Sequence, residues 1–258
     1  TGGRIVHFVS GGAALDPSLN WWFESMGLSL LQGYGLTETS PVISVNPHDA
    51  NRIGTVGRPI DGAEVMIADD GEILTRGPHV MKGYWNKPQA TDEVFIEGWF
   101  QTGDIGVLED GYLRVTDRKK NILVTSTGKN VAPQPLENAL AMSRYVEQLV
   151  VVGDGQRFVA ALVVPDFVIL RNWAEKRDKH KTPEELCIDT DVIDLVRSEI
   201  DALQADFSTF EQVRDFRLLP TPFTIDDGTL TPTLKTVRRV VESKYAELID
   251  EIYSEGES

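Results

Sequence analysis

The first 31 residues arrange an apolar strand, a helix and a second apolar strand in immediate succession. Residues 5–9 and 28–31 are the short apolar runs that predict the strands. Between them, Asp16 followed by Pro17 is a favoured helix start, because Asp caps free backbone amides and Pro suits the first helical position. Gly27 can end this helix. The order implies a parallel sheet, and since one such unit is too small to form a domain, we expect the sheet to continue in sequence upstream.

Residues 52–118 have a different pattern, in which short alternating runs lie between turn signals. The runs at residues 64–68 and 72–75 flank Asp69-Asp70-Gly71, and a second turn follows at Asp110-Gly111. We therefore expect a small antiparallel sheet or β-barrel after the strand–helix–strand unit.

Beyond residue 120 the chain mixes predicted strands and helices. The apolar runs at residues 148–152 and 158–164 flank Gly153-Asp154-Gly155 and predict a hairpin. A helix is expected over residues 135–142, and residues 191–205 place their apolar side chains on one helical face.

A final helix is expected over residues 235–253, and the boundary between the two parts is expected in the polar stretch 117–121. The sequence thus predicts an α/β and α+β architecture. In this architecture a strand–helix–strand unit and a small β-barrel precede a smaller α+β domain.

The chain carries 40 acidic and 25 basic residues, a formal net charge of −15. This balance argues against a broad nucleic-acid or anionic-membrane surface, because phosphate binding requires clustered cations. Any anionic ligand must therefore meet a local basic patch. No apolar run reaches the length of a membrane-spanning helix. The single cysteine, Cys187, excludes an internal disulfide, is interpreted as a buried thiol rather than a nucleophile, and predicts a cytoplasmic protein.

A glycine-containing segment, residues 33–38, follows the second predicted strand. Glycines let backbone approach a ligand closely, and Tyr34 offers a flat face to a nucleotide base. The Thr37 hydroxyl can donate to a phosphate oxygen, and the Glu38 carboxylate can hold Mg²⁺, which prefers oxygen ligands. An ordinary loop with a capping Thr explains the same residues.

Two further candidate clusters lie before and after the expected turn at Asp110-Gly111. Asp104, after Gly103, can accept both hydroxyls of a ribose, although an Asp in this position also caps turns. Arg118-Lys119-Lys120 can bind phosphate or lie at a hinge, although a solvated charged face is the usual explanation of such a short basic run.

The second half of the chain contributes two candidate loops. Residues 126–133 can pass a ligand close to the backbone, or can simply lead into a helix. Lys235 is expected at a helix start, where a cation is unfavourable for the helix dipole. A lysine is a movable point charge that suits an anionic transition state, so this conflict points to function.

In this order the clusters resemble the motifs of the adenylate-forming (AMP-binding) enzymes, which include acyl-CoA synthetases, firefly luciferases and peptide-synthetase adenylation domains. The resemblance covers essentially the whole chain. The segments that carry it are residues 33–38, 54–59, 71–77, 81–85, 102–104, 117–120 and 231–238. Residues 128–137 and 230–235 look most like the long-chain fatty acyl-CoA synthetases.

The resemblance implies a nucleotide site. The residues that would border the adenine are Gly11, Gly12, Ala13 and Tyr34. By the same resemblance Thr37 would contact the α-phosphate, Glu38 would hold Mg²⁺, Asp104 would bind the ribose hydroxyls, and Arg118 would support the nucleotide.

The resemblance also implies two domains with different roles. Residues 1–119 would be the distal part of a large AMP-binding domain, and residues 120–258 would be a mobile C-terminal domain that turns about Lys120. Lys235 would act in adenylation, and Gly128 would lie where the pantetheine of CoA passes. The implied substrates are a fatty acid, ATP and CoA, with no nucleic-acid partner.

Two departures from the family pattern bear on these expectations. Leu234 stands where many relatives have Gly before the final lysine, which favours the long-chain subgroup. The Ser/Thr/Gly-rich phosphate loop does not occur in the sequence, so we expect the 258-residue chain by itself to have no adenylation activity. A carrier protein as acyl acceptor and a non-catalytic truncated chain stay open as alternatives, as do chain-length preference, peripheral membrane association and oligomeric state.

Overall fold

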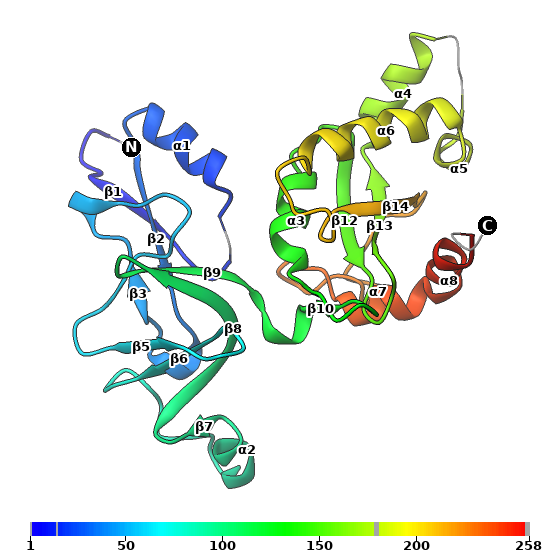
Figure 1. Ribbon diagram of the computed structural model, residues 1–258. Helices are drawn as coiled ribbons and strands as arrows, with labels where there is room; N and C mark the ends of the chain where they lie inside the picture. Colours follow the sequence, from blue (N-terminus) through cyan, green and yellow to red (C-terminus); the bar gives the residue numbers. More distant parts are fainter. Residues whose placement is uncertain (1, 14, 178–180, 256–258) are drawn as a thin grey trace. The chain divides into compact units, whose positions relative to one another are not determined.

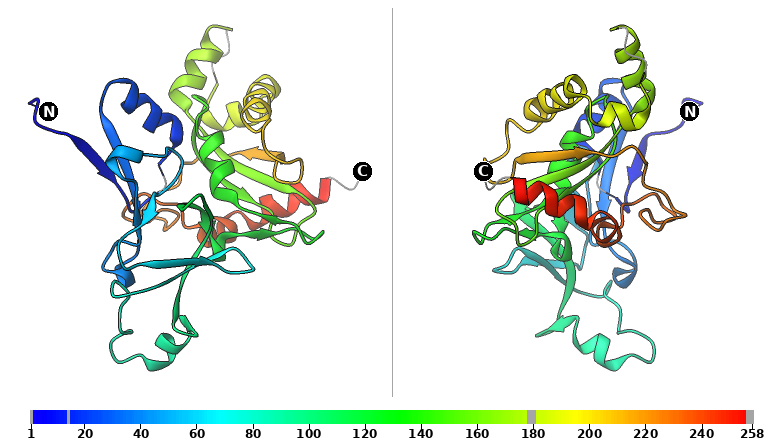
Figure 2. Two further views of the ribbon diagram at one scale, coloured as in Figure 1. Left: turned by 60° about the vertical axis from the view of Figure 1, so that its left-hand side comes forward. Right: turned by 90° about the vertical axis from the view of Figure 1, so that its right-hand side faces the viewer.

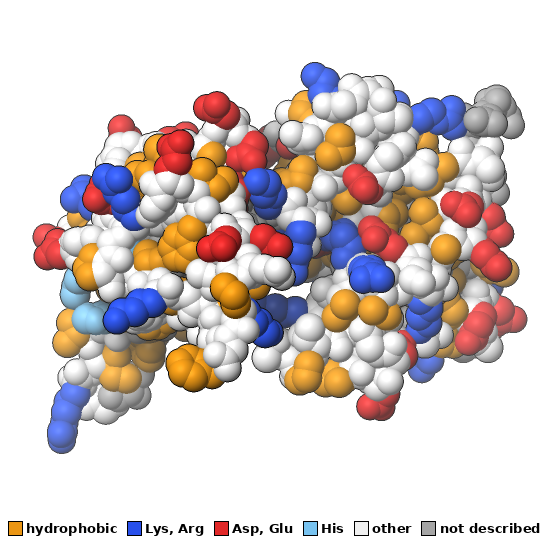
Figure 3. Space-filling view, turned by 90° about the horizontal axis from the view of Figure 1, so that it is seen from below, with side chains coloured by type: hydrophobic (Ala, Val, Ile, Leu, Met, Phe, Trp, Pro, Cys, Tyr) orange, Lys and Arg blue, Asp and Glu red, His pale blue; other side chains and the backbone are white. Residues whose placement is uncertain are grey.

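A computed structural model describes residues 2–13, 15–177 and 181–255. The chain divides into two compact units, Thr1–Lys120 and Asn121–Ser258 (Figure 1). Acidic, basic and hydrophobic side chains are interspersed on the face shown in Figure 3. Within the described residues, no helix combines the length and apolar character needed to cross a membrane.

The first unit begins with the expected parallel pair. Strand β1 (His7–Ser10) pairs in parallel with β2 (Ser29–Tyr34), and helix α1 (Pro17–Ser25) connects them. Asp16 caps α1 by accepting a hydrogen bond of 2.7 Å from the backbone amide of Ser18. Two short antiparallel strands, β3 (Ser44–Val45) and β4 (Arg58–Pro59), extend this sheet from β2. Between the strands lie the 3₁₀ turns η1 (Thr37–Thr39) and η2 (His48–Ala50).

The second sheet of this unit is antiparallel and has the order β5-β6-β8-β7, with β9 also on β8. Its elements are β5 (Glu64–Ile67), β6 (Glu72–Arg76), α2 (Pro88–Asp92), β7 (Phe95–Ile96), β8 (Trp99–Glu109) and β9 (Tyr112–Arg118). The expected turn at Asp110-Gly111 joins β8 to β9, and both residues have positive φ, as a tight hairpin requires. Among the described residues the strands form an open sheet, not a closed barrel, because β7 and β9 share one edge of β8 and β5 pairs only with β6.

The two sheets of the first unit are joined through backbone. The amide of Val56 donates to the carbonyl of Leu113 at 2.8 Å, and the amide of Leu113 donates to the carbonyl of Gly57 at 2.8 Å. These bonds connect the turn before β4 to β9 and hold the end of one sheet against the other.

The second unit is built around a three-stranded sheet with helices on both faces (Figure 2). Strand β13 (Val159–Pro165) is antiparallel to β12 (Val146–Val152), as the expected hairpin requires, and parallel to β14 (Val213–Leu218). Because side chains alternate along a strand, β13 contributes Val159, Ala161 and Val163 to one core and Ala160, Leu162 and Val164 to the other.

Helices of the second unit segregate to the two cores. The first core contains residues of α3 (Pro133–Leu140), α4 (Phe167–Glu175), α5 (Pro183–Cys187) and α6 (Thr190–Leu203). The second core contains residues of α7 (Arg238–Lys244) and α8 (Ala246–Glu255). A small hairpin, β10 (Leu123–Val124) with β11 (Asn130–Val131), follows the 3₁₀ turn η3 (Lys119–Asn121). Cys187 is buried in the first core, and burial raises the pKa of its thiol to about 12, which agrees with the expectation of an unreactive thiol.

The prediction of one final helix over residues 235–253 was wrong. Residues 238–255 form two helices, α7 and α8, which are separated at Tyr245. Upstream of α7, Leu230 pairs with Thr236 in an isolated antiparallel bridge, and Leu234 has a φ of 60°. A residue in the left-handed region cannot continue a right-handed helix, so the helix starts only after this turn.

Candidate functional site

The carboxyl ends of β1 and β2 lie together because the two strands are parallel and in register, with Ser10 opposite Gln32. The loop after β1 contains Gly11, Gly12 and Ala13, and a Cβ added at Gly11 would lie 3.4 Å from the carbonyl of Gly33. The predicted adenine neighbours of this loop therefore come close to the segment that carries Tyr34. Crevices beyond the carboxyl ends of parallel strands are common places for ligands.

The turn after β2 is stabilised by Thr39 and not by Thr37, the threonine that the sequence suggested as a phosphate contact. The Thr39 hydroxyl accepts a hydrogen bond from the Leu36 amide at 2.9 Å, and Thr39 is fully buried. Thr37 is exposed at the first position of η1. The structural role of a capping threonine thus belongs to Thr39, which leaves the Thr37 side chain on the surface of the turn.

Gly35 is where this turn passes closest to the backbone of a later segment. A Cβ added there would lie 1.7 Å from the carbonyl oxygen of Pro41, far inside contact distance. Gly33, two residues earlier, meets its nearest neighbour at 3.5 Å, an ordinary contact.

We expect Gly35→Ala to lower the free energy of unfolding by about 1–3 kcal/mol, the usual cost of overpacking, because backbone must move to admit the methyl group. Thermal and denaturant unfolding of the protein measures this loss. Gly33→Ala is the matched control and should cost much less. Equal losses in the two variants would mean that the crossing at Gly35 is not a steric constraint.

Asp104 is the centre of a buried polar cluster. It lies on β8, with its side chain 4% exposed, and faces Arg118 across the β8–β9 pair. The Tyr34 hydroxyl donates to Oδ2 of Asp104 at 2.6 Å, and Nε of Arg118 lies 2.9 Å from Oδ1. The carboxylate therefore connects side chains from β2, β8 and β9, and it does not cap a turn.

A bulge in β8 orients the Asp104 side chain toward Tyr34 and Arg118. Between the pairs Leu74–Gln101 and Glu72–Ile105, β8 contains two more residues than β6, and Gly103 has a φ of 69°. Bulges of this kind redirect side chains, and they are frequent near active sites. The Thr102 hydroxyl accepts from the Asp104 amide at 3.1 Å and stabilises the bulge.

Burial determines the protonation chemistry of this cluster. Desolvation raises the pKa of Asp104, whereas the Tyr34 hydrogen bond and the Arg118 charge lower it. Burial, together with the charge of Asp104, also raises the pKa of Tyr34, so the phenol stays protonated and donates. Since desolvation has the largest effect, the Asp104 carboxyl group takes up a proton at a higher pH than an exposed Asp does.

Glu38 has an unexpected partner in Tyr84. The Tyr84 hydroxyl donates to Oε1 of Glu38 at 3.0 Å, and the Met81 amide donates to the Glu38 carbonyl at 2.7 Å. The segment 81–84 therefore packs on the turn that carries Thr37 and Glu38. The only indication in the sequence was the resemblance of residues 81–85 to a family motif, which implied no role for Tyr84.

The donor set around Glu38 fits a particular kind of metal site. Within residues 2–13, 15–177 and 181–255 no group of three or more His, Cys, Asp or Glu side chains could hold a metal ion. Magnesium in nucleotide enzymes is commonly bound by one or two carboxylates, while waters and substrate phosphates complete its six oxygen ligands. Glu38 fits as a single protein ligand of an ion that arrives with a nucleotide.

The basic triplet does not act as one patch. Arg118 pairs with Asp104, whereas Lys119 pairs with Glu72 at 2.8 Å and Asp70 at 2.7 Å. Glu72 is buried and also accepts from the Gly103 amide at 2.9 Å, so it connects the bulge to the end of β9. Lys120 is exposed in η3, at the boundary of the two compact units.

Gly128 and Lys235 belong to the second unit. Gly128 has a φ of 76° in the turn between β10 and β11, where its amide donates to the Thr125 carbonyl at 2.8 Å. Lys235 lies three residues before α7, not at a helix start as expected, so the helix-dipole argument for it does not apply. Its amide donates to the Thr231 hydroxyl at 3.0 Å, and its carbonyl accepts from the Thr231 amide at 2.8 Å.

The first unit thus gathers most of the predicted nucleotide residues at one end of its sheets. Its contacts join Tyr34 to Asp104 and Arg118, and they bring Gly11 close to Gly33. Gly12 and Ala13 follow Gly11 in the loop after β1, and Thr37 and Glu38 lie on the turn after β2. Gly128, Lys235 and the rest of the second unit form a separate body. Two compact units, the first with a parallel pair of strands beside an antiparallel sheet and the second with a three-stranded sheet between helices, are the class of fold to compare with known proteins.

Comparison with known proteins agrees with this assignment. The model of the AMP-binding enzyme family matches residues 1–85, and the model of the AMP-binding enzyme C-terminal domain matches residues 120–257. The chain belongs to the AMP-binding enzyme family.

Among its relatives, the long-chain-fatty-acid–CoA ligase FadD15 of Mycobacterium tuberculosis is 43% identical over 98% of this chain. The long-chain-fatty-acid–[acyl-carrier-protein] ligase AEE15 of Arabidopsis thaliana is 36% identical over 95% of it. The chain spans 43% of the length of the first relative and 35% of the second.

Solved structures share the fold. The A domain of carboxylic acid reductase from Segniliparus rugosus, in complex with AMP and a co-purified carboxylic acid, superposes with a TM-score of 0.78 at 27% identity. The match covers 98% of this chain and 40% of that one. The mixed α/β and α+β architecture expected from the sequence is confirmed.

Proposed function

We propose that this chain is the C-terminal part of a cytoplasmic, AMP-forming long-chain fatty acid–CoA ligase. Its most informative structural feature is the buried Asp104 carboxylate, which holds Tyr34 and Arg118 at the end of the first unit's sheets. The choice of a long-chain fatty acid and CoA rests on the identity of 43% to a ligase with those substrates.

In the first half-reaction the fatty carboxylate attacks the α-phosphorus of ATP and pyrophosphate leaves. Asp104 accepts the ribose hydroxyls, Arg118 supports the nucleotide, and Tyr34 with residues 11–13 borders the adenine. Thr37 donates to the α-phosphate, and Glu38 holds Mg²⁺ beside the phosphates. Magnesium held by Glu38 would supply positive charge beside the phosphates, and Lys235 would add its own charge where negative charge develops around phosphorus.

In the second half-reaction the CoA thiol attacks the acyl carbon, and AMP leaves. The pantetheine passes Gly128 in the β10–β11 turn, where a Cβ would meet no atom within 4 Å. Since Gly128 and Lys235 serve different steps from one compact unit, the second unit turns about Lys120 between the half-reactions, a hinge motion.

Product analysis of the full-length enzyme tests this function. With a long-chain fatty acid, ATP, Mg²⁺ and CoA, we expect acyl-CoA, AMP and pyrophosphate in equal amounts. Formation of ADP, or no fatty-acid-dependent pyrophosphate exchange, would rule the proposal out.

A carrier protein is the second candidate acceptor, because AEE15 is a ligase with that acceptor. The two candidates share the first half-reaction and differ only in the thiol. Offering CoA and a phosphopantetheinylated carrier protein in parallel separates them, and preference for the carrier protein would replace CoA in the proposal.

We expect Asp104→Ala in the full-length enzyme to weaken ATP binding by about tenfold to a hundredfold, because hydrogen bonds to a charged group contribute about 1.5–3 kcal/mol. Fatty acid binding should change little. Isothermal titration calorimetry measures both affinities in one preparation.

Thr102→Ser is the matched control, since it keeps a hydroxyl beside the bulge and leaves the Asp104 carboxylate in place. It should bind ATP nearly as well as the wild type. Equal ATP affinity in Asp104→Ala and the wild type would leave Asp104 with a purely structural role.

A further inference from the structure

Lys235 is carried by a loop with the hydrogen bonds of a tight hairpin. The Val237 amide donates to the Thr229 carbonyl at 2.8 Å, and Leu230 pairs with Thr236. At the tip, the Leu234 amide donates to the Thr231 carbonyl at 2.8 Å, while the Leu234 side chain is 70% exposed. A tip of this kind keeps its direction only if the base of the hairpin is fixed to the rest of the unit.

The outgoing limb of this hairpin, which leads into α7, is fixed by a largely buried ion pair. Nη2 of Arg238 lies 2.6 Å from Oε1 of Glu137 on α3, and the two side chains are only 16% and 15% exposed. Nη1 of Arg238 donates to the carbonyl of Val151 on β12. The same Glu137 oxygen accepts from the Val151 amide at 2.8 Å. The first residue of α7 is thereby bonded to both α3 and β12.

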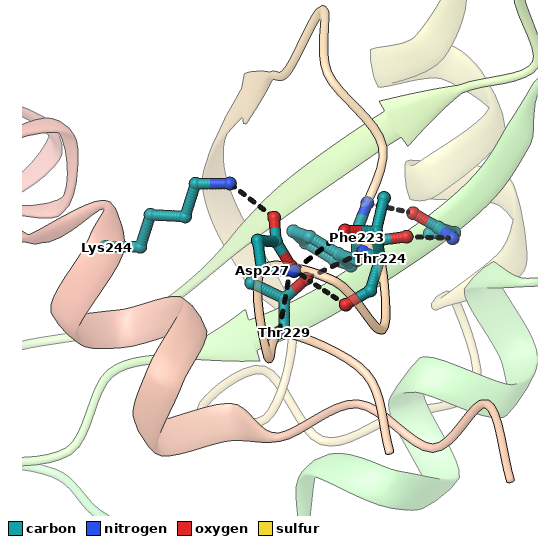
Figure 4. Close-up of polar contacts among 6 residues, drawn as sticks. Phe223, Thr224, Asp227, Thr229 and Lys244 are labelled. Carbon is teal, nitrogen blue, oxygen red and sulfur yellow. Dashed lines mark hydrogen bonds and ion pairs between the residues drawn. The ribbon is translucent and has the colours of Figure 1, made fainter. Parts of the chain in front are cut away.

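The incoming limb of the hairpin, which contains Thr229 and Leu230, is fixed by a separate polar network (Figure 4). Thr229 is fully buried, and its hydroxyl accepts from the Thr224 amide at 2.8 Å. Its amide donates to Oδ1 of Asp227 at 3.0 Å, and Lys244 of α7 pairs with Oδ2 of Asp227 at 2.7 Å. Gln148 on β12 then holds the backbone of Phe223 through both its amide and its carbonyl.

We propose that Arg238 and Glu137 are positioning residues that fix the direction of Lys235 relative to the sheet of the second unit. The pair also connects the Lys235 hairpin to α3, which begins directly after the loop that contains Gly128. The two loops that serve different half-reactions therefore belong to the same compact unit. This inference rests on the role proposed above for Lys235 in adenylation.

A positioning role and a merely structural role predict different results. We expect Arg238→Gln in the full-length enzyme to slow single-turnover acyl-adenylate formation on the order of tenfold to a hundredfold, the usual effect of a small misplacement. Thioester formation from supplied acyl-adenylate should stay within about twofold of wild type, a difference too small to indicate a lost interaction. Arg239→Gln makes the same change of charge at the next, exposed residue and should affect neither step.

Hydrogen exchange gives a second readout that does not depend on activity. In Arg238→Gln the peptide that covers residues 229–237 should exchange faster than in wild type, while the peptide of β13 should not change. Because removal of one buried partner can weaken the fold, Arg238→Lys and the double variant Glu137→Gln/Arg238→Gln are measured as well. Lysine keeps the charge but lacks the planar fork that reaches Val151 and Glu137 from two separate nitrogens, so we expect a smaller loss in the same half-reaction.

The outcomes separate this inference from the proposed function. Equal loss of both half-reactions, with faster exchange throughout the sheet, would assign Arg238 a structural role and overturn the inference. Unchanged adenylation in Arg238→Gln, in a preparation series where Lys235→Ala is impaired, would also overturn it. If Lys235→Ala itself were fully active, the proposed role of Lys235 would fail, and hydrogen exchange alone would decide whether the ion pair orders the hairpin.

Discussion

Lys235→Ala in the full-length enzyme is expected to slow acyl-adenylate formation on the order of 10²–10³-fold, the usual cost of losing one electrostatic group aimed at transition-state charge. The expectation rests on the hairpin, which presents Lys235 at its tip between two fixed limbs. Single-turnover assays of pyrophosphate release measure the first step. Thioester formation from supplied acyl-adenylate should be close to wild type, because the phosphoryl chemistry is already complete.

Lys176→Ala is the matched control, because Lys176 is an exposed lysine of the same unit at the end of α4. It should affect neither half-reaction. A full adenylation rate in Lys235→Ala would remove Lys235 from the mechanism, whereas equal loss of both steps would indicate a damaged C-terminal unit.

Lys120→Pro is expected to impair thioester formation more than adenylation, the reverse of the effect expected for Lys235→Ala. On one side of Lys120, Lys119 is bonded to Glu72 and Asp70 of the first unit, and on the other side Leu123 is buried in the first core of the second unit. Any rotation must therefore be absorbed by the few residues between these anchors. Proline fixes φ near −65° and also restricts the residue before it. One arrangement of the two units should then be trapped.

We expect thioester formation in Lys120→Pro to fall at least about tenfold further than adenylation, a difference of roughly 1.4 kcal/mol in barrier height. Adenylation should suffer less because its arrangement has to be reached only once. Single-turnover measurement of both steps in one preparation is the test, and circular dichroism checks that the fold is intact.

Lys120→Ala is the control, since it removes the same charge but leaves the backbone free to rotate. It should retain both half-reactions. Proportional loss of both steps in Lys120→Pro, or loss of neither, would show that the pivot is elsewhere and that Lys120 is only a surface charge.

Local patterns in the sequence predicted the elements of the fold well where their causes are local. The Asp16-Pro17 helix start, the turn at Asp110-Gly111 and the hairpin around residues 153–155 all occur as expected. Capping and turn chemistry act within a few residues, so they can be predicted without knowledge of distant parts of the chain. The resemblance to the adenylate-forming family then connected separate motifs that no local pattern could connect.

The final helix was predicted wrongly because the apolar pattern of residues 235–253 carries no indication of how the chain enters it. Leu234 adopts a left-handed conformation, which leucine does not favour by itself, within a turn bonded at both limbs to the rest of the unit. Arg238, the first residue of α7, is also bonded to Val151 and Glu137, which lie 87 and 101 residues away along the chain, so a local pattern does not reveal these contacts.

The candidate residues for a nucleotide site, and most of the strands and helices around them, could be predicted from local patterns and from the family resemblance. Three contacts could be seen only in the folded protein: the hydrogen bond between Tyr34 and Asp104, 70 residues apart, and the pairs Glu38–Tyr84 and Glu137–Arg238. The physical reason is that propensity and periodicity are properties of neighbours in the chain. Bonds between buried polar side chains depend instead on which surfaces the packed sheets and helices bring within about 3 Å of each other.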